Sequence, residues 1–548
     1  MAPSVFSTTV VLCFCFILVP QDTNAVSPTS NKYKFLYFPF GSTGSHFMTL
    51  SQSANVLARL GHHVTFLSSN DAPKWQRADD ADVFSRVVFK TRYTKTDEMN
   101  AAHELSRTTL RGESRNGFFI FNSIYNSVVY GNPPIVDVFL GQCDDLLSDD
   151  LAIAKLRSEE FDMLVGDSGL ICNPLLAQKL DIPFVLCSNL PIIPAGYRLY
   201  YGVPADPSYI PEYTTRYTSN EMTFFQRVHN VLSYGVQDFL LRQYLEMYYP
   251  LKVKHNIKPE MSMLDSQRQA EIMFFNGNYP LETARPLNPN TIFINPVVGL
   301  PSNQVVVNED VADFLETAPA GFVICSFGSY VAVMERDTLQ MFADGFALLP
   351  YRVLWQTNGH MSNIKLADNV KIVKWVPLAQ IMNHTNAKAI VSHGGINSVV
   401  EATLAALPVV GIPLMVDQFS NIDKVVAYGL GIALEFNEVT PQTLSSAITT
   451  VVEKPRFRER ALHASRILSD LTSFAPPAET QANWILHVTK FGGDHLRPPI
   501  NDSYFSNLLD VYLFLVLILA LILGFNVCFL YFCCVRRCTR NQGKDKRE

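Results

Sequence analysis

The densest group of residues that could bind a ligand runs from Trp375 to Gln418. Within it, Ser392-His393-Gly394-Gly395 follows a predicted strand and opens a predicted helix. Glycines at such a junction let a ligand approach the backbone, and the positive end of a helix favours an anion. Asn397 and Ser398, in the first helical turn, add hydrogen-bond donors near the same point. The junction therefore predicts a phosphate-binding site.

Two further residues in this segment complete the outline of a ligand. Glu401 lies four residues after Asn397 on the same helix face, where its carboxylate could accept hydrogen bonds from vicinal hydroxyl groups. Trp375 offers a flat aromatic face for a base. Each feature alone is common, because most strand–helix turns bind nothing and most tryptophans are core residues. Their ordered combination indicates a nucleoside diphosphate joined to a sugar.

This segment resembles the signature of the UDP-glycosyltransferase family (glycosyltransferase family 1), whose members have the GT-B fold. The resemblance extends over nearly the whole chain, including residues 207–211 (PSYIP) and 222–230 (MTFFQRVHN). It implies a UDP-sugar as co-substrate. Its implied contacts are Trp375 with uracil, Glu401 with the ribose hydroxyls, His393, Gly394, Asn397, Ser398 and Ser329 (in Ser326-Phe327-Gly328-Ser329) with the diphosphate, and Asp417 and Gln418 with the sugar.

Two positions depart from the family pattern. Leu378 follows Pro377 where the family usually has glutamine, and the nearest glutamine is Gln380. Gln356 stands where animal members often carry arginine. Both departures bear on donor affinity and donor preference, but neither removes a group that takes part in the chemistry.

An acid–base pair is expected in the first part of the chain. His46 follows Ser45 at the start of a predicted helix, and Asp167 follows a predicted strand. A helix N-terminus disfavours the imidazolium ion, so we expect a neutral His46 that can accept a proton. From the residues alone, a helix-capping histidine would be the simpler interpretation. The family resemblance instead implies that His46 deprotonates the acceptor, that Asp167 supports it, and that the anomeric configuration inverts.

No pattern in the sequence points to a metal ion. An Asp-x-Asp element is not evident, and no Cys/His cluster has the spacing of metal ligands. The sequence therefore predicts an enzyme that needs neither a metal nor a further cofactor.

The elements that position these residues follow an α/β pattern. Residues 34–40 and 64–68 are predicted strands with a helix between them that ends at Gly61, which is one βαβ unit. A second α/β series begins at Phe322 after Pro286–Pro289. We therefore expect two Rossmann-like lobes facing a cleft. The predicted lobes are 26–285 for the acceptor and 286–480 for the UDP-sugar, followed by a helical segment and linker at 481–510.

Both ends of the chain predict a membrane protein of the secretory pathway. Residues 1–25 are typical of a cleaved signal peptide. Residues 511–535 carry no charge and are long enough to cross a hydrocarbon core of about 30 Å. The basic tail at 536–548 places the body on the lumenal side and ends in a sequence similar to an endoplasmic reticulum retrieval signal. Sequons at Asn383 and Asn501 suit that compartment.

Composition excludes some classes of protein and leaves other questions open. A net charge of −6 is against nucleic-acid binding, and 48% hydrophobic residues are against a disordered chain. Four cysteines in the body allow three pairings: Cys143, Cys172, Cys187 and Cys325. Aromatic residues at 118–130 could line an acceptor pocket. A homo- or heterodimer is compatible with the family resemblance.

The leading hypothesis is a single-pass type I glycosyltransferase of the endoplasmic reticulum membrane. It would transfer glucuronic acid or glucose from a UDP-sugar to a hydroxyl of a small lipophilic acceptor. One alternative is a dedicated lipid hexosyltransferase acting on ceramide or a sterol, and Gln418 does not decide between the sugars. Another is a non-catalytic UDP-sugar-binding membrane protein, which would be expected to lack His46 or Asp167, and both are present.

Overall fold

The computed structural model describes residues 32–40, 45–71, 83–101, 134–189, 194–218, 222–277, 279–294, 308–328, 334–357, 359, 361–414, 417–497 and 502–542. Five predicted features lie outside these residues: the signal peptide, the aromatic stretch 118–130, Ser329, Asn501 of the second sequon and the lysine-containing end of the tail.

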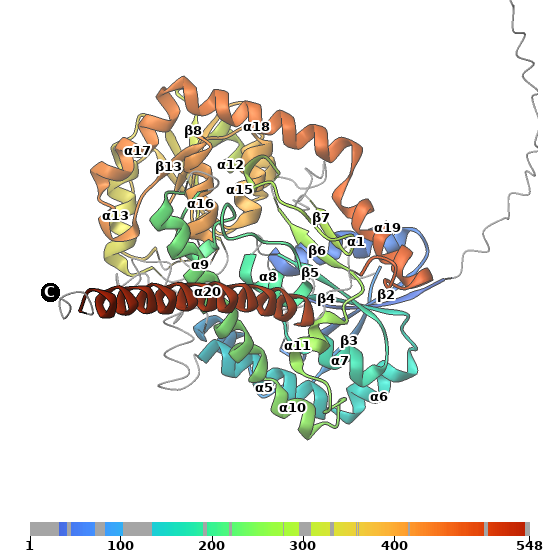
Figure 1. Ribbon diagram of the computed structural model, residues 1–548. Helices are drawn as coiled ribbons and strands as arrows, with labels where there is room; N and C mark the ends of the chain where they lie inside the picture. Colours follow the sequence, from blue (N-terminus) through green and yellow to red (C-terminus); the bar gives the residue numbers. More distant parts are fainter. Residues whose placement is uncertain are drawn as a thin grey trace, which may run out of the picture.

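The first lobe is a parallel sheet whose described strands follow the order β3-β2-β1-β4-β5-β6-β7 (Figure 1). The strands are β1 Lys34–Phe38, β2 His63–Ser69, β3 Ser85–Phe89, β4 Met163–Asp167, β5 Phe184–Ser188, β6 Met273–Asn276 and β7 Thr291–Ile294. The helices are α1 Ser45–Arg59, α5 Pro134–Ser148, α6 Asp150–Ser158, α7 Cys172–Leu180, α8 Pro194–Tyr201, α9 Phe224–Glu246, α10 Tyr249–Lys254 and α11 Met263–Arg268, with short 3₁₀ turns η1 Tyr213–Thr215 and η2 Tyr279–Leu281.

The interior strand β1 is an unbroken apolar run after Lys34, and its packing explains why. Leu36 and Phe38 pack into one hydrophobic cluster with α7, whereas Phe35 and Tyr37 pack into another with α1. Successive side chains of a strand point to opposite faces, so a strand covered by helices on both faces must be apolar at every position. The predicted βαβ unit is confirmed, because β1 pairs in parallel with β2 through α1.

The second lobe repeats this architecture with a parallel sheet in the order β10-β9-β8-β11-β12-β13 among the described strands. Its strands are β8 Phe322–Ser326, β9 Arg352–Gln356, β10 Val370–Val373, β11 Ala387–Ser392, β12 Val409–Gly411 and β13 Gly431–Ala433. Its helices are α12 Glu309–Glu316, α13 Arg336–Ala347, α14 Leu378–Met382, α15 Ile396–Leu404, α16 Gln418–Ala427, α17 Pro441–Glu453 and α18 Pro455–Phe474, with the 3₁₀ turn η3 Phe436–Glu438. The predicted α/β class with two lobes is confirmed.

The division between the lobes differs in detail from the predicted ranges. Strand β7 pairs with β6, so the first sheet continues to Ile294, beyond the expected end at residue 285. Pro286 and Pro289 lie in the connection between these two strands, so the proline cluster marks a loop within one lobe. Helix α19, Pro477–Phe491, returns to the first lobe and packs on α1 (Figure 1). Its buried residues are Ala482, Ile485 and Val488.

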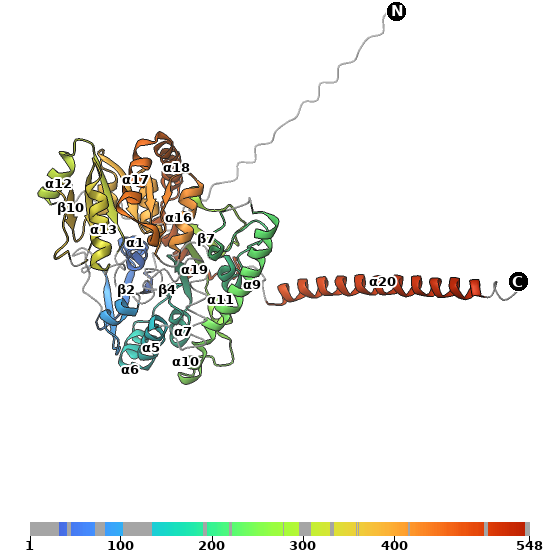
Figure 2. The same ribbon diagram turned by 90° about the vertical axis from the view of Figure 1, so that its left-hand side faces the viewer.

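The last described helix, α20 Asp502–Gln542, leaves the body and contains a 22-residue apolar segment from Tyr512 to Cys533 (Figure 2). Within the described residues it is the one helix long and apolar enough to cross a membrane. The large apolar side chains of this segment are exposed, unlike those of a core helix.

The structure selects one cysteine pairing from those that the sequence left open. Cys143 in α5 and Cys172 at the start of α7 form a disulfide that joins two helices on the same face of the first sheet. Cys187 and Cys325 are free, buried thiols.

Candidate active site

The predicted acid–base pair is brought together at the carboxyl ends of two neighbouring strands. Asp167 is the last residue of β4, and His46 lies in the first turn of α1, the helix that follows β1. Since β1 and β4 are adjacent in the sheet, the His46 Nδ1 and Asp167 Oδ2 atoms lie 2.6 Å apart. The imidazole is 17% exposed and the carboxylate 1% exposed, so the ring is accessible while its partner is shielded.

Further hydrogen bonds hold the Asp167 carboxylate in place. Its Oδ1 accepts the backbone N–H of Gly169 at 2.8 Å, and its Oδ2 also accepts Asn189 Nδ2 at 3.2 Å. Asn189 Oδ1 accepts Asn276 Nδ2 at 2.7 Å, which fixes the orientation of the Asn189 amide. A carboxylate surrounded by donors accepts the Nδ1–H of His46, and this leaves Nε2 as the basic nitrogen.

The hydrogen bonds from Asn276 to Asn189 and from Asn189 to Asp167 form a relay, and neither asparagine was predicted from the sequence. Asn189 follows β5 and Asn276 ends β6, so both lie at the same sheet edge as Asp167. The usable signal was a polar residue directly after each of two apolar strands. Recognising it also required the strand order β4-β5-β6, which places these ends side by side.

The protonation expected for His46 needs correction. Burial lowers the pKa of its imidazole, but the charge and hydrogen bond of Asp167, together with the charge of Asp417, raise it above the ordinary value of 6.5. The predicted effect of the helix N-terminus is therefore outweighed by two carboxylates. The ring is a stronger base than expected, and a smaller fraction of it is neutral near pH 7.

Asp417 faces the His46 pair from the second lobe. It directly precedes α16 and is 8% exposed, and burial raises its pKa to about 6, opposed by a hydrogen bond from Asn421 and by the positive charge at His46. The Nδ2 atom of Asn421 lies 2.8 Å from Asp417 Oδ2 and 2.9 Å from the Gly394 carbonyl oxygen. Neighbouring Gln418 accepts the backbone N–H of Leu414. Asn421, which sequence reasoning missed, therefore joins the predicted sugar-binding and phosphate-binding segments.

The predicted phosphate-binding turn is packed so closely that glycine is required on both sides of His393. A Cβ atom at Gly328 would lie 2.8 Å from His393 Cε1, and one at Gly395 would lie 2.7 Å from Nε2. Gly328 also has a φ of +73°, which L side chains rarely adopt. Burial lowers the pKa of His393 to about 4, so its ring is neutral at pH 7. Gly394, with a φ of +84°, contacts Ile422 of α16.

Three buried polar atoms near the predicted donor site have no hydrogen-bond partner among the described residues. They are Gln380 Oε1, His393 Nδ1 and Asn397 Oδ1. A buried polar atom without a partner costs about 1–3 kcal/mol, and a ligand that hydrogen-bonds to these atoms would remove that cost. Two belong to the predicted phosphate turn and the third to the glutamine that is displaced from the family position.

The remaining predicted donor residues have environments that suit a ligand. Trp375 is 65% exposed, which is high for a tryptophan and leaves a ring face open for stacking. Burial raises the pKa of Glu401 in α15 to about 7. Ser398 lies in the first turn of α15, half-buried. Gln356 Oε1 accepts the backbone N–H of Val376 at 3.2 Å, so this departure from the family pattern supports the segment that carries Trp375.

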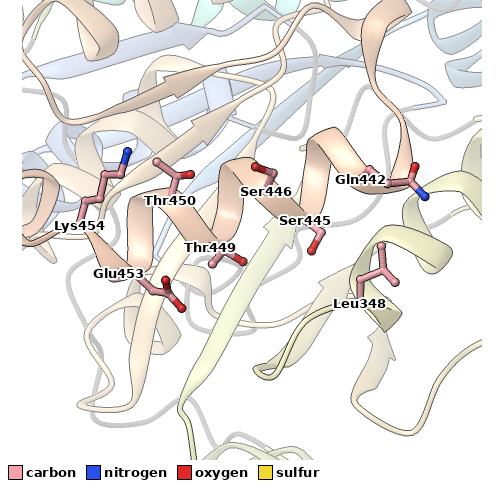
Figure 3. Close-up of a pocket in the computed structure, with 8 residues that line it drawn as sticks. All are labelled: Leu348, Gln442, Ser445, Ser446, Thr449, Thr450, Glu453 and Lys454. Atoms are coloured by element: carbon pink, nitrogen blue, oxygen red, sulfur yellow. The ribbon is translucent and has the colours of Figure 1, made fainter.

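A separate pocket of about 380 Å³ runs along α17 and shares no residue with this site (Figure 3). Its lining consists of Leu348, Gln442, Ser445, Ser446, Thr449, Thr450, Glu453 and Lys454. We assign no chemistry to this pocket.

No group of three or more His, Cys, Asp or Glu side chains is arranged to hold a metal ion within the described ranges. Independence from metal ions stays a prediction.

Solved structures with the same arrangement of two lobes are glycosyltransferases, and the chain has their GT-B fold. The glycotransferase of kitacinnamycin matches with a TM-score of 0.57 at 17% identity, over 83% of this chain and 98% of that one. SnogD from Streptomyces nogalater matches with a TM-score of 0.55 at 17% identity, over 84% of this chain and all of that one.

The sequence model of the family described as UDP-glucoronosyl and UDP-glucosyl transferase matches residues 34–545, and the chain belongs to this family. It is 29% identical to 2-hydroxyacylsphingosine 1-beta-galactosyltransferase of Rattus norvegicus, over 86% of this chain and 83% of that protein. It is 30% identical to UDP-glucuronosyltransferase 3A2 of Mus musculus, over 88% and 89% respectively. The protein is therefore an enzyme that transfers a hexosyl group from a UDP-sugar.

Proposed function

We propose that this enzyme transfers glucuronic acid or glucose from its UDP-sugar to a hydroxyl group of a small lipophilic acceptor, with inversion at the anomeric carbon. The observation that carries the proposal is the His46–Asp167 pair, which faces Asp417 across the junction of the lobes. An oxygen nucleophile between the two lobes would have a base on one side and the donor sugar on the other.

In the proposed reaction, His46 Nε2 takes the proton of the acceptor hydroxyl as its oxygen attacks the anomeric carbon. The bond between that carbon and the diphosphate oxygen breaks, and UDP leaves with the bonding electrons from the opposite face. The Asp167 carboxylate, 2.6 Å from Nδ1, stabilises the imidazolium that forms. One bond forms and one breaks in a single displacement, so the α-linked sugar of the donor becomes β-linked.

The second lobe would hold the donor. We assign stacking on uracil to Trp375, the ribose hydroxyls to Glu401, the sugar hydroxyls to Asp417 and Gln418, and the diphosphate to His393, Gly394, Asn397, Ser398 and Ser329. Because His393 is neutral, its contribution at the diphosphate would be a hydrogen bond and not a charge. The helix N-terminus of α15 would supply the favourable electrostatic field.

We further propose that the segment Tyr512–Cys533 spans the endoplasmic reticulum membrane as a single-pass type I anchor. The body would then lie in the lumen after removal of the predicted signal peptide. Asn383, in the first predicted sequon, is exposed, and its Nδ2 donates to the Ala379 carbonyl oxygen at 2.7 Å. A membrane tether would keep the cleft close to acceptors that partition into the bilayer.

A dedicated lipid hexosyltransferase is the second candidate. It is supported by the similarity to the galactosyltransferase of Rattus norvegicus, whose name specifies 2-hydroxyacylsphingosine as its acceptor. A non-catalytic UDP-sugar-binding protein is disfavoured by the intact geometry of His46 and Asp167.

A donor and acceptor panel tests these proposals. The detergent-solubilised full chain is incubated with UDP-glucuronic acid, UDP-glucose or UDP-galactose, each with phenols, sterols or ceramide, and the product linkage is read by NMR. β-Linked glucuronides or glucosides of phenols support the first proposal. Transfer to ceramide or to a sterol alone supports the second candidate, and an α-linked product contradicts the proposed mechanism.

A further inference from the structure

Arg216 of the first lobe makes a concentrated set of contacts with the second. Its Nε and Nη2 atoms donate to the two carboxylate oxygens of Asp423 at 3.0 and 2.9 Å, and Nη1 donates to Glu435 at 2.9 Å. The guanidinium also lies 5.5 Å from the ring centre of Phe419. Planar, two-point recognition of a carboxylate is specific to arginine among the basic residues.

The segment that presents Arg216 is itself fixed to the first lobe. Glu212, which precedes η1, is fully buried, and its Oε2 accepts the backbone N–H of Ala195 at the start of α8. Its own backbone N–H donates to Asn230 in α9. Arg216 has a φ of +58°, a left-handed conformation that is uncommon for a residue with a side chain. Such strain is retained where the surroundings hold the residue in place.

Two of the three side chains that Arg216 contacts lie on the helix that begins at the predicted sugar-binding residues, and the third, Glu435, follows β13. Asp423 and Phe419 both lie on α16, whose first residue is Gln418 and whose preceding residue is Asp417. Both views show α16 on the side of the second lobe that faces the first (Figures 1 and 2).

A second ion pair of opposite polarity lies directly beside the first. Lys424, the residue after Asp423, pairs with Glu282 in the connection between β6 and β7 at 2.6 Å. Asp423 and Lys424 of α16 thus pair with Arg216 and Glu282, respectively, and both of these partners belong to the first lobe.

The Arg216–Asp423 pair is sensitive to loss of either partner. Burial raises the pKa of Asp423 even though Arg216 opposes this shift. Removing the guanidinium alone would therefore leave a largely buried, unpaired carboxylate, which weakens the contact between α16 and the first lobe. Removing the charges of both partners avoids that penalty.

We propose that Arg216 is a positioning residue, which holds α16 against the first lobe and so fixes Asp417 and Gln418 at the separation from His46 that sugar transfer requires. This inference rests on the proposed function, in which these two residues bind the sugar. It predicts that Arg216 acts more strongly on the sugar half of the donor than on the UDP half, because Asp417 and Gln418 stand at the start of α16. Trp375 and Asn397 lie on other elements, and α16 reaches the phosphate turn through Asn421 and Ile422 at Gly394.

The test uses the full chain in detergent and the variants Arg216→Met, Arg216→Lys, Asp423→Asn and the double variant Arg216→Met/Asp423→Asn. Arg242→Met is the matched control, since Arg242 pairs with Asp238 at 3.1 Å within α9 alone. For each protein, the dissociation constants of UDP and of the accepted UDP-sugar, the kcat of transfer and the Tm are measured.

Arg216→Met is expected to lower kcat roughly ten- to a hundredfold, the scale of a misplaced reacting group. The contribution of the sugar to affinity, measured as the ratio of the dissociation constants of UDP and UDP-sugar, should also fall, and kcat should fall by a larger factor than the affinity for UDP. Arg216→Lys should retain only part of the activity, because lysine keeps the positive charge but cannot make the two-point contact. The double variant should be no worse than Arg216→Met, and the control should match the native protein.

Equal losses in UDP affinity and kcat would show a general structural role and overturn the proposal. So would a lowered Tm with native kcat, or additive effects in the double variant. Native protein that binds UDP-sugar more tightly than UDP but transfers nothing would contradict the proposed function alone, because the affinity ratio of Arg216→Met can still be measured. If the native protein transfers the sugar and Arg216→Met has the same kcat and the same affinity ratio, this inference alone is contradicted.

Discussion

Replacing Asp167 by asparagine isolates the charge that acts on the proposed base. The new amide side chain would have almost the same size and could still accept the Nδ1–H of His46, but the negative charge 2.6 Å from the imidazole would be lost. A hydrogen bond to a charged group contributes about 1.5–3 kcal/mol. Because the charge of Asp167 contributes to the raised pKa of His46, that pKa should fall in the variant.

The direction of the effect on activity follows from which form of His46 reacts. Transfer needs the neutral imidazole, so native kcat/KM should rise with pH through the raised pKa of His46. In Asp167→Asn this acidic limb should move to lower pH, while the plateau falls about 10²- to 10⁴-fold, because a weaker base has lost the partner that stabilises its protonated form.

The effect of Asp167→Asn on stability also depends on pH. The pKa of His46 is raised by folding, so its stabilising contribution is complete below the unfolded pKa of about 6.5 and is lost as pH rises through the folded pKa. The Tm of Asp167→Asn should therefore lie further below that of the native protein at pH 5.5 than at pH 9.

The assay is kcat/KM from pH 5 to 9, with Tm at both ends of this range. Asp162→Asn is the matched control, since Asp162 lies just before the opposite end of β4 and binds the backbone N–H of Lys34 at 2.7 Å. This control should keep the native acidic limb. An Asp167→Asn variant whose acidic limb stays at the native pH would refute the assignment of His46 as the base held by Asp167.

Three further predictions concern the surroundings of the pair and the donor site. Asn189→Leu removes one donor to Asp167 and should lower kcat severalfold with an unchanged UDP dissociation constant, both measured at pH 7.5. Because the pKa of Glu401 is about 7, calorimetry should find UDP binding about tenfold weaker at pH 6 than at pH 8, and Glu401→Gln should remove that pH dependence. Gly328→Ala places a Cβ 2.8 Å from His393 at a φ of +73°, which should lower both Tm and UDP affinity and cost about 1–3 kcal/mol of stability. Native Tm and UDP affinity in that variant would contradict the packing described around His393.

Much of the fold could be predicted because its signals are local. After Lys34, the strand β1 is apolar at every position because both its faces are buried, and Gly61 follows α1 close to its end. The same reasoning placed Asp167 and His46 at the carboxyl ends of strands. That these strands are adjacent followed only from the family resemblance, and the structure shows the pairing directly.

Other features depend on contacts between residues far apart in the chain, which a sequence pattern does not encode. The relay from Asn276 through Asn189 to Asp167 requires the order of three strands. The contact of Arg216 with Asp423 requires the relative placement of two lobes. The proline cluster before Thr291 has the composition of a domain linker, yet strand pairing makes it a loop inside the first sheet.

The raised pKa of His46 illustrates the same limit for electrostatics. Its position at a helix N-terminus can be read from the sequence and favours a neutral ring. The opposing charges of Asp167 and Asp417 come from a neighbouring strand and from the other lobe, and together they reverse the direction.

The most direct test of the account is single-turnover release of UDP from the native full chain and from His46→Ala, each saturated with the accepted UDP-sugar and a phenol acceptor. The account predicts rapid release by the native protein, and release at least about 10²-fold slower in the variant with an unchanged dissociation constant for UDP. Release by His46→Ala at the native rate would contradict the central claim that His46 is the base for transfer.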